Sequence, residues 1–131
     1  KRAIVLPVSV AAHSSLMNKC SINLHKELKN ININIGNKIL FPIIHNVDAA
    51  IKTDTDGIIN TLCKQICNPV LWEDSIEYMH KNNIRNFVEI GPGQVLTGLN
   101  IKIFSSENNS TVLNLPTFSP EKMNTALEEL I

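Results

Sequence analysis

The stretch FVEIGPGQVLTGL, residues 87–99, decides the fold class of this chain. Residues 87–90 are apolar except for Glu89 and predict a buried strand, after which Gly91-Pro92-Gly93 predicts a tight turn. Apolar residues then recur at helical spacing from Val95 to Ile103. A glycine-rich turn before a helix can also bind phosphate, but this one has neither dinucleotide-fingerprint spacing nor a Gly-Lys-Ser. We therefore favour a plain strand–turn–helix connection over a phosphate site.

The same alternation extends along the chain in both directions. Strands are predicted at residues 3–10, 39–47, 87–90 and 111–115, and helices at residues 14–28, 53–67, 71–80, 95–103 and from Ser119 onward. Ser14 or Ser15 is expected to cap the first helix, and Ser119 the last, with Pro120 as its first residue. Residues 30–37 fit a strand or an extended loop equally well. Strands that alternate with helices predict an α/β layer with a mostly parallel sheet.

Composition excludes several classes of protein. The chain has 131 residues, of which 44% are hydrophobic and 18% charged, which is typical of a globular domain or part of one. Twelve basic residues balance twelve acidic ones, so no net field attracts nucleic acid or an anionic membrane. No apolar run approaches the roughly 20 residues of a membrane span.

The three cysteines predict a reducing compartment, which favours a cytoplasmic location. Cys63 and Cys67 lie four apart on a predicted helix, where two thiolates can share a metal. No histidine or aspartate nearby completes such a site, so we favour two reduced, half-buried thiols.

Four histidines are candidates for catalysis. His25 lies in a polar helical stretch, His80 suits the negative end of a helix dipole, and His45 follows an apolar strand from which it can reach a pocket. His13 stands out because small residues flank it at a predicted strand-to-helix turn, where open α/β sheets bind ligands. A structural histidine that caps the helix would explain His13 nearly as well.

A histidine base needs a nucleophile, and the sequence offers none in the usual turn. No glycine of the chain begins a Gly-x-Ser-x-Gly motif. Ser9, Ser14 and Ser15 are too close in sequence to His13 to be its partner. Either His13 is not a base, or its nucleophile lies upstream of Lys1, as the abrupt start without Met also suggests.

Four segments, taken in order, resemble one family. They are KRAIVLPVSVAAHSSLM, FPIIHNVD, KQICNPVLWEDSIEYM and FVEIGPGQVLTGL, which start at residues 1, 41, 64 and 87. Together they are similar to the C-terminal part of malonyl-CoA:acyl carrier protein transacylases of bacterial type II fatty acid synthesis. The resemblance implies an α/β-hydrolase-like acyltransferase core with an inserted ferredoxin-like subdomain. Residues 1–9 would be the last strand of that subdomain and residues 10–131 part of the core.

The resemblance also implies a reaction and its site. A malonyl-CoA:[acyl-carrier-protein] S-malonyltransferase (EC 2.3.1.39) moves malonyl from malonyl-CoA to the phosphopantetheine thiol of acyl carrier protein through a seryl acyl-enzyme, without a cofactor or metal. His13 would be the general base, and the backbone carbonyl of Gln65 would orient it. Asn46 would contact substrate, with Gly91-Pro92-Gly93 in a supporting role. The serine, a carboxylate-binding arginine and the oxyanion loop would precede Lys1.

Alternatives to an active transferase remain open at this point. The chain would be inactive by itself, as a fragment of a monomeric cytoplasmic enzyme. Otherwise it is a non-catalytic remnant that binds acyl carrier protein or CoA, or the acyltransferase domain of a polyketide synthase. Ala11 and Ala12 precede the histidine, at a place where related acyltransferases differ according to their extender unit. These small residues do not decide whether the transferred group is malonyl or methylmalonyl.

Overall fold

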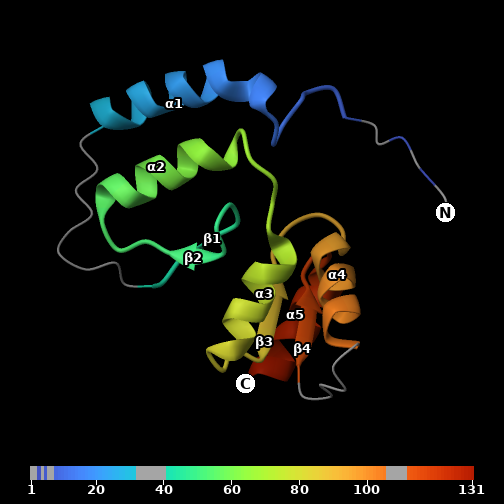
Figure 1. The fold of residues 1–131 in the computed structure, drawn as a ribbon. Coiled ribbons are helices and arrows are strands. Elements are labelled where there is room, and N and C mark those ends of the chain that lie inside the picture. Colours follow the sequence, from blue (N-terminus) through green and yellow to red (C-terminus); the bar gives the residue numbers. More distant parts are fainter. Residues whose placement is uncertain (1–2, 4, 6–7, 32–40, 106–111) are drawn as a thin grey trace. The chain divides into compact units, whose positions relative to one another are not determined.

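The computed structural model describes residues 3, 5, 8–31, 41–105 and 112–131, which form two compact units (Figure 1). The first unit comprises residues 1–75 and the second residues 76–131. The α/β class predicted from the sequence is confirmed. None of the described residues between 3 and 10 forms a strand, and the others in that range lie outside the described residues, as does most of the segment 30–37.

Two helices pack side by side in the first unit, α1 (Asn18–Asn30) and α2 (Thr55–Gln65) (Figure 1). A single 3-10 turn, Ser15–Met17, leads into α1. Ser21 Oγ on α1 donates to the carbonyl oxygen of Cys63 on α2 at 2.8 Å. An exposed ion pair joins the same helices, from Lys29 Nζ to Asp56 Oδ1 at 2.6 Å. These contacts fix α2 against the segment that carries His13.

The start of α2 is capped by an aspartate, two residues after the start at residue 53 that the sequence predicts. The cap is Asp54, so the first helical residue is Thr55. Asp54 has extended backbone angles, and its Oδ1 accepts the N–H of Gly57 at 2.7 Å. The carboxylate lies so close to the first turn that a Cβ on Gly57 would be 2.8 Å from Asp54 Oδ2. A side chain at position 57 would therefore displace the capping carboxylate.

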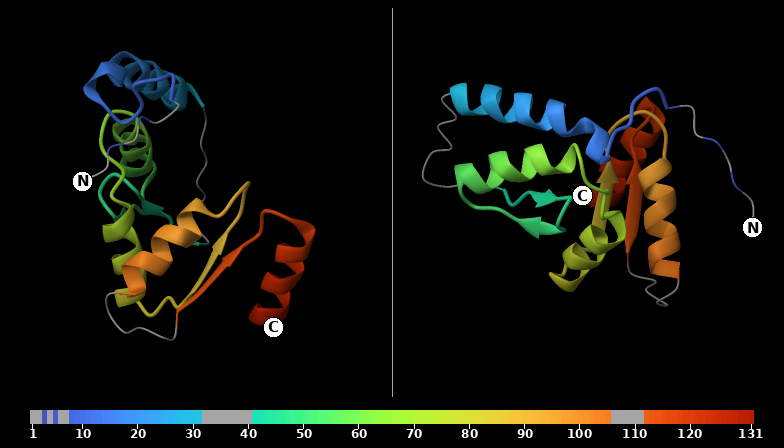
Figure 2. Two further views of the ribbon diagram at one scale, coloured as in Figure 1. Left: turned by 90° about the vertical axis from the view of Figure 1, so that its right-hand side faces the viewer. Right: turned by 45° about the horizontal axis from the view of Figure 1, so that its top comes forward.

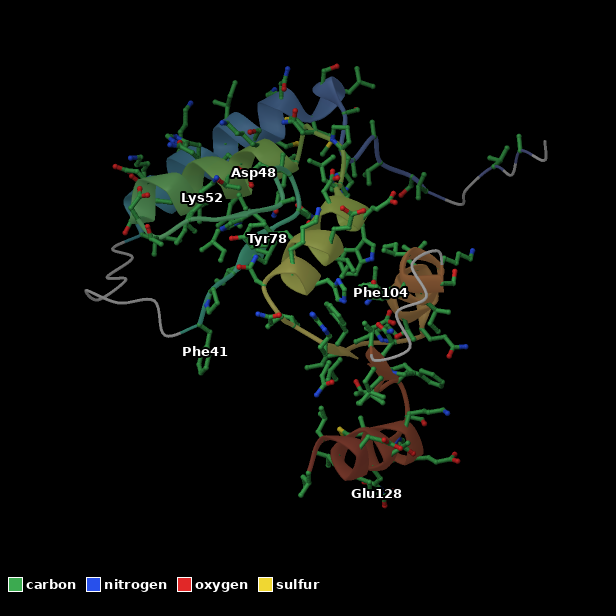
Figure 3. All side chains as sticks on the ribbon, turned by 60° about the horizontal axis from the view of Figure 1, so that its bottom comes forward. Phe41, Asp48, Lys52, Tyr78, Phe104 and Glu128 are labelled. Carbon is green, nitrogen blue, oxygen red and sulfur yellow. The ribbon has the colours of Figure 1, made fainter. Side chains whose placement is uncertain are left out.

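A short hairpin completes the first unit. Strand β1 (Ile44–His45) pairs with β2 (Ala50–Ile51) in antiparallel fashion, and Lys52 Nζ reaches Asp48 Oδ2 at 2.6 Å beside it (Figure 3). The strand predicted over residues 39–47 is thus much shorter, and residues 39–40 lie outside the described residues. The partner strand β2 was not predicted, because two residues show no alternation to read.

Helix α3 (Trp72–Lys81) begins three residues after Pro69, close to its predicted range, and crosses the division between the units. In the second unit, β3 (Asn86–Glu89) pairs in parallel with β4 (Leu113–Pro116), which confirms the predicted parallel pairing. Helix α4 (Val95–Ser105) connects the two strands and packs on both, and α5 (Pro120–Leu130) packs on β4 (Figure 2).

The core of the second unit forms around Phe104. Its ring centroid lies 5.7 Å from that of Phe87 and 5.1 Å from that of His80, and Leu115 and Ala126 are also buried. The prediction that residues 87–90 are buried is wrong, because β3 alternates between half-buried and exposed and Ile90 is 88% exposed. Within the described residues β3 has only β4 as a strand neighbour, so one of its edges and part of its faces stay open.

The final helix begins as predicted. Ser119 has extended backbone angles, its Oγ accepts from the N–H of Lys122 at 3.2 Å, and Pro120 is the first helical residue. None of the helices in the described ranges combines the length and the apolar character that a membrane span requires.

Candidate functional site

His13 lies in the turn that precedes the 3-10 turn and α1, as predicted. Its backbone has a positive φ of 61°, a conformation that few residues other than glycine adopt. Ser14 stands in the N-cap position but makes no cap hydrogen bond, because its hydroxyl donates instead to the carbonyl oxygen of Ala11 at 2.7 Å. The hydroxyl therefore closes the turn around His13 rather than capping the helix.

Hydrogen bonds to the end of α2 hold His13 in this conformation. Its backbone N–H donates to the carbonyl oxygen of Ile66 at 2.9 Å. Its ring Nδ1 lies 2.8 Å from the carbonyl oxygen of Gln65 and 3.2 Å from that of Asn68. An unusual backbone conformation persists where surrounding contacts determine it, and such positions cluster at functional sites.

The ring contacts determine which nitrogen of His13 carries the proton. A carbonyl oxygen only accepts hydrogen bonds, so Nδ1 must carry the hydrogen that it donates to Gln65. The neutral ring then has its lone pair on Nε2. Because the residue is exposed, Nε2 is accessible to a reacting group. This is the arrangement that a general base needs.

The carbonyl oxygens are available because α2 ends where it does. The last carbonyls of a helix have no partner within the helix. Pro69 disfavours helical angles at Asn68, so the chain leaves α2 there and no further turn uses these oxygens. The C-terminus of a helix also carries a partial negative charge, which makes its carbonyl oxygens good acceptors for the imidazole N–H. Apart from the stop at Asn68-Pro69, no local pattern of residues predicts the contacts of Ile66 and Asn68 with His13.

The predicted substrate residue Asn46 lies at the end of β1. Its Oδ1 is buried and has no hydrogen-bond partner among the described residues, and the same is true of Nε2 of His45, a residue only 4% exposed. The carbonyl oxygen of Asn46 accepts the N–H of Leu71 at 2.6 Å. The structure brings His13 and Gln65 together, whereas no hydrogen bond in the described part of the chain joins Asn46 to His13.

The glycine-rich turn is a structural connection. Both carboxylate oxygens of Glu89 accept N–H groups at the start of α4, from Leu96 at 3.1 Å and Thr97 at 2.7 Å. Burial raises the pKa of Glu89, but the hydrogen bonds from Thr97, Leu96 and Val95 outweigh it and hold that pKa below its ordinary value. A carboxylate already occupies the position that a phosphate would need, which settles the choice against a phosphate site.

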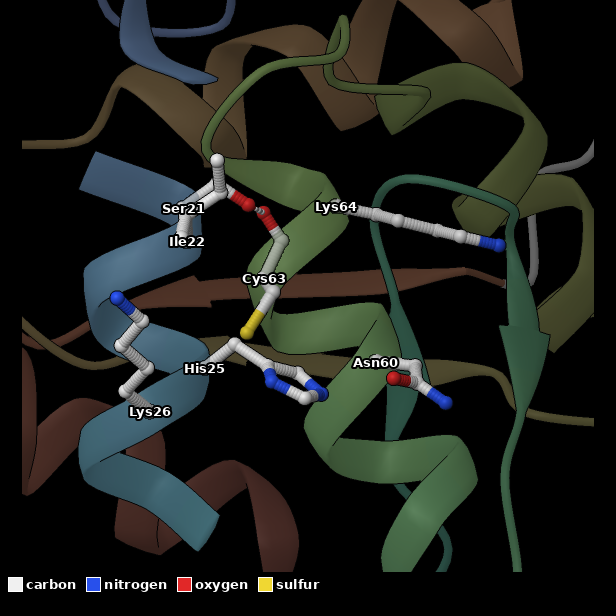
Figure 4. A pocket seen from close by; sticks show the side chains of 7 residues that line it. All are labelled: Ser21, Ile22, His25, Lys26, Asn60, Cys63 and Lys64. Atoms are coloured by element: carbon white, nitrogen blue, oxygen red, sulfur yellow. Dashed lines mark hydrogen bonds between the residues drawn. The ribbon is translucent and has the colours of Figure 1, made fainter. Parts of the chain in front are cut away.

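A shallow pocket of about 430 Å³ lies between α1 and α2 (Figure 4). Its lining residues are Ser21, Ile22, His25, Lys26, Asn60, Cys63 and Lys64. Burial, and then the neighbouring Cys67, raises the pKa of the Cys63 thiol, so Cys63 is a poor nucleophile at neutral pH. Within the described ranges, no three histidine, cysteine, aspartate or glutamate side chains are grouped so that they could hold a metal ion.

Comparison with curated proteins places the chain among known sequences. It is 40% identical over 117 residues to the malonyl CoA-acyl carrier protein transacylase of Escherichia coli K12, a match that covers 89% of this chain and 37% of that protein. It is 34% identical over 130 residues to the transacylase of the same name from Bacillus subtilis 168, with 99% and 38% covered. The chain therefore spans little more than a third of the length of these relatives. No family model matches it.

Solved structures agree with the sequence comparison. A malonyl-transacylase in complex with a type II polyketide synthase acyl-carrier protein superposes with a TM-score of 0.86 at 34% identity, over 98% of this chain and 39% of that one. The malonyl CoA-acyl carrier protein transacylase of Clostridium perfringens superposes with a TM-score of 0.84 at 34% identity, over 98% and 38%. The resemblance expected from the four sequence segments is confirmed.

Proposed function

Because this chain is related in sequence and in fold to the malonyl CoA-acyl carrier protein transacylases, we propose that it supplies the general base of a malonyltransferase. The reaction would move malonyl from malonyl-CoA to the phosphopantetheine thiol of an acyl carrier protein, for fatty acid biosynthesis. The observation that carries the proposal is the hydrogen bond from His13 Nδ1 to the Gln65 carbonyl, which leaves Nε2 free to take a proton.

The proposed transfer has two half-reactions that share this base. In the first, Nε2 takes the proton of a serine hydroxyl as the serine oxygen attacks the malonyl thioester, and the imidazolium returns the proton to the sulfur of the departing CoA. In the second, Nε2 takes the proton of the carrier-protein thiol, whose sulfur attacks the seryl ester and releases the serine oxygen, which is reprotonated by the imidazolium. The serine would come from a part of the transferase that these 131 residues do not cover.

The end of α2 would take the role that a buried aspartate has in a Ser-His-Asp triad. The Gln65 and Asn68 carbonyls fix the ring orientation and tautomer, and they face the imidazolium that forms in each half-reaction. Two neutral acceptors stabilise that cation less than a full negative charge would. The arrangement therefore fits a transfer whose first half-reaction expels a thiolate, which is a good leaving group.

Several finer assignments belong to the same proposal. The described α/β core would be part of an α/β-hydrolase-like acyltransferase core, with residues 1–9 as the end of a ferredoxin-like subdomain and residues 10–131 as core. The buried, unpartnered Oδ1 of Asn46 is an acceptor suited to a substrate donor. The complete enzyme would be a cytoplasmic monomer that uses no cofactor.

Intact-mass spectrometry of the natural protein, with and without malonyl-CoA, tests the proposal. We expect a mass well above the 14.6 kDa of this chain and a gain of one malonyl group. That adduct should disappear when a carrier protein with its phosphopantetheine thiol is added. A protein of 14.6 kDa that gains no adduct would contradict the transferase and favour a remnant that binds acyl carrier protein or CoA without turnover.

A further inference from the structure

The turn that follows α2 is closed by the side chain of Asn68. Its Nδ2 donates to the carbonyl oxygen of Lys64 at 2.7 Å, and that oxygen also accepts the N–H of Cys67 at 3.1 Å. Residues 64–68 thus form a ring closed by two hydrogen bonds on a single acceptor. The residue that closes the ring also presents its own carbonyl oxygen to His13 Nδ1, at 3.2 Å.

The other groups that hold His13 lie inside this ring. The carbonyl oxygens of Gln65 and Ile66, which accept from the ring and from the backbone of His13, fall between the two ends that Asn68 joins. They belong to the last turn of a helix, the part that frays most readily. Without the Nδ2 bond, the Cys67 N–H and the contacts with His13 itself would be left to restrain the turn, and its three carbonyls would spread over more orientations.

We propose that the Asn68 side chain is a positioning residue for His13, which it serves by holding the carbonyl oxygens that fix the imidazole tautomer. The expected effect on turnover rests on the proposed function, whereas the expected effect on the tautomer of the His13 ring does not. Asn68 acts through the backbone and touches no reacting atom. Its removal should lower the fraction of His13 rings with the hydrogen on Nδ1, and the turnover number with it, while substrate affinity is unchanged.

The chain supplies a matched control and a rescue. Asn82 Nδ2 donates to the carbonyl oxygen of Tyr78 at 2.8 Å, which is the same bond to the fourth preceding residue at the end of α3. None of the carbonyls that accept from His13 belongs to that turn. Serine hydroxyls also reach the fourth preceding carbonyl, as Ser75 Oγ does with Leu71 at 2.6 Å. Asn68→Ser should therefore restore part of what Asn68→Ala removes.

The test compares Asn68→Ala, Asn68→Ser and Asn82→Ala in the full-length protein. With histidine labelled by ¹⁵N, we expect the His13 ring shifts of wild type to report the Nδ1–H tautomer. In Asn68→Ala they should move toward the Nε2–H form, in Asn68→Ser only partly, and in Asn82→Ala not at all. Malonyl transfer should show kcat lowered roughly 3- to 10-fold in Asn68→Ala, the factor that one neutral hydrogen bond accounts for, with KM unchanged.

Two results overturn the inference. One is an Asn68→Ala protein with wild-type ring shifts, and the other is an equal loss of kcat in Asn68→Ala and Asn82→Ala, which would mark general destabilisation. A wild-type protein that transfers no malonyl contradicts the proposed function instead. In that case the ring shifts alone still decide whether Asn68 positions His13.

Discussion

Nδ1 of His13 and the carbonyl oxygen of Gln65 are 2.8 Å apart, although 52 positions separate the two residues in the sequence. The contact joins the turn before α1 to the end of α2, and Ser21 Oγ bonded to the Cys63 carbonyl holds the same two helices together. The imidazole of the candidate base is therefore oriented by backbone carbonyls at the end of α2, whereas the bond from Ser14 to Ala11 closes the turn that carries it.

Loss of His13 is expected to stop transfer. In the full-length enzyme, His13→Ala should lower turnover by at least about 100-fold, the low end for loss of a general base. His25→Ala is the control, since His25 lies on α1 beside the pocket and contacts none of the α2 carbonyls that hold His13. Steady-state malonyl transfer measures both, and near-normal turnover in His13→Ala would remove His13 from the mechanism.

Gln65 is expected to tolerate replacement of its side chain. The hydrogen bond to His13 comes from the Gln65 backbone, which Gln65→Ala retains in a residue with high helix propensity. Turnover should therefore stay within about 3-fold of wild type, less than one hydrogen bond accounts for. Circular dichroism should first show that α2 is intact. A loss comparable to that of His13→Ala would mean that the amide side chain takes part directly.

Glu89 should make the second unit sensitive to acid. Its folded pKa lies below its ordinary value of 4.5, so the stability it contributes is present above pH 4.5 and is lost as the pH falls through the lowered pKa. Glu89→Gln should lower the free energy of unfolding at pH 7 by about 1 kcal/mol, a typical value for a helix cap. Thermal melts from pH 7 to pH 3 should show the difference from wild type shrink.

The exposed Glu128 on α5 provides the comparison for that experiment. Glu128→Gln removes one carboxylate from a helix without removing a cap of α4, so its melting temperature should follow that of wild type throughout. If the melting temperature of Glu89→Gln also equals that of wild type at pH 7, the hydrogen bonds from Leu96 and Thr97 to Glu89 contribute nothing measurable to stability.

Residues 1–131 produced alone are expected to aggregate and to be inactive. Large apolar side chains are exposed, among them Phe41 at 78%, Val95 at 72% and Ile90 at 88%, and the β3–β4 pair has open edges within the described residues. Light scattering and size-exclusion chromatography check the first part, and a transfer assay the second. A soluble monomer with a cooperative melt and measurable malonyl transfer would contradict both.

The features predictable from the sequence are those fixed by neighbouring residues. Ser119-Pro120 before α5 marks a helix start through a local hydrogen bond, and this start was predicted. The contact between His13 and Gln65 was expected only from the family resemblance, since no local pattern encodes a bond across 52 residues. The hydrogen bonds of Glu89 to the start of α4 were not predicted either. Their donors, Leu96 and Thr97, come after the glycine-rich turn, and the sequence does not show how that turn directs them.

Gly57 limits how α2 can be engineered. Replacement of a helical glycine by alanine is a standard way to raise thermal stability, because it restricts the denatured chain. Here the added methyl group would collide with the Asp54 carboxylate, so the gain in α2 would be offset by a displaced cap. Serine at residue 54, whose side chain is shorter, would keep a capping oxygen and leave more room for that methyl group.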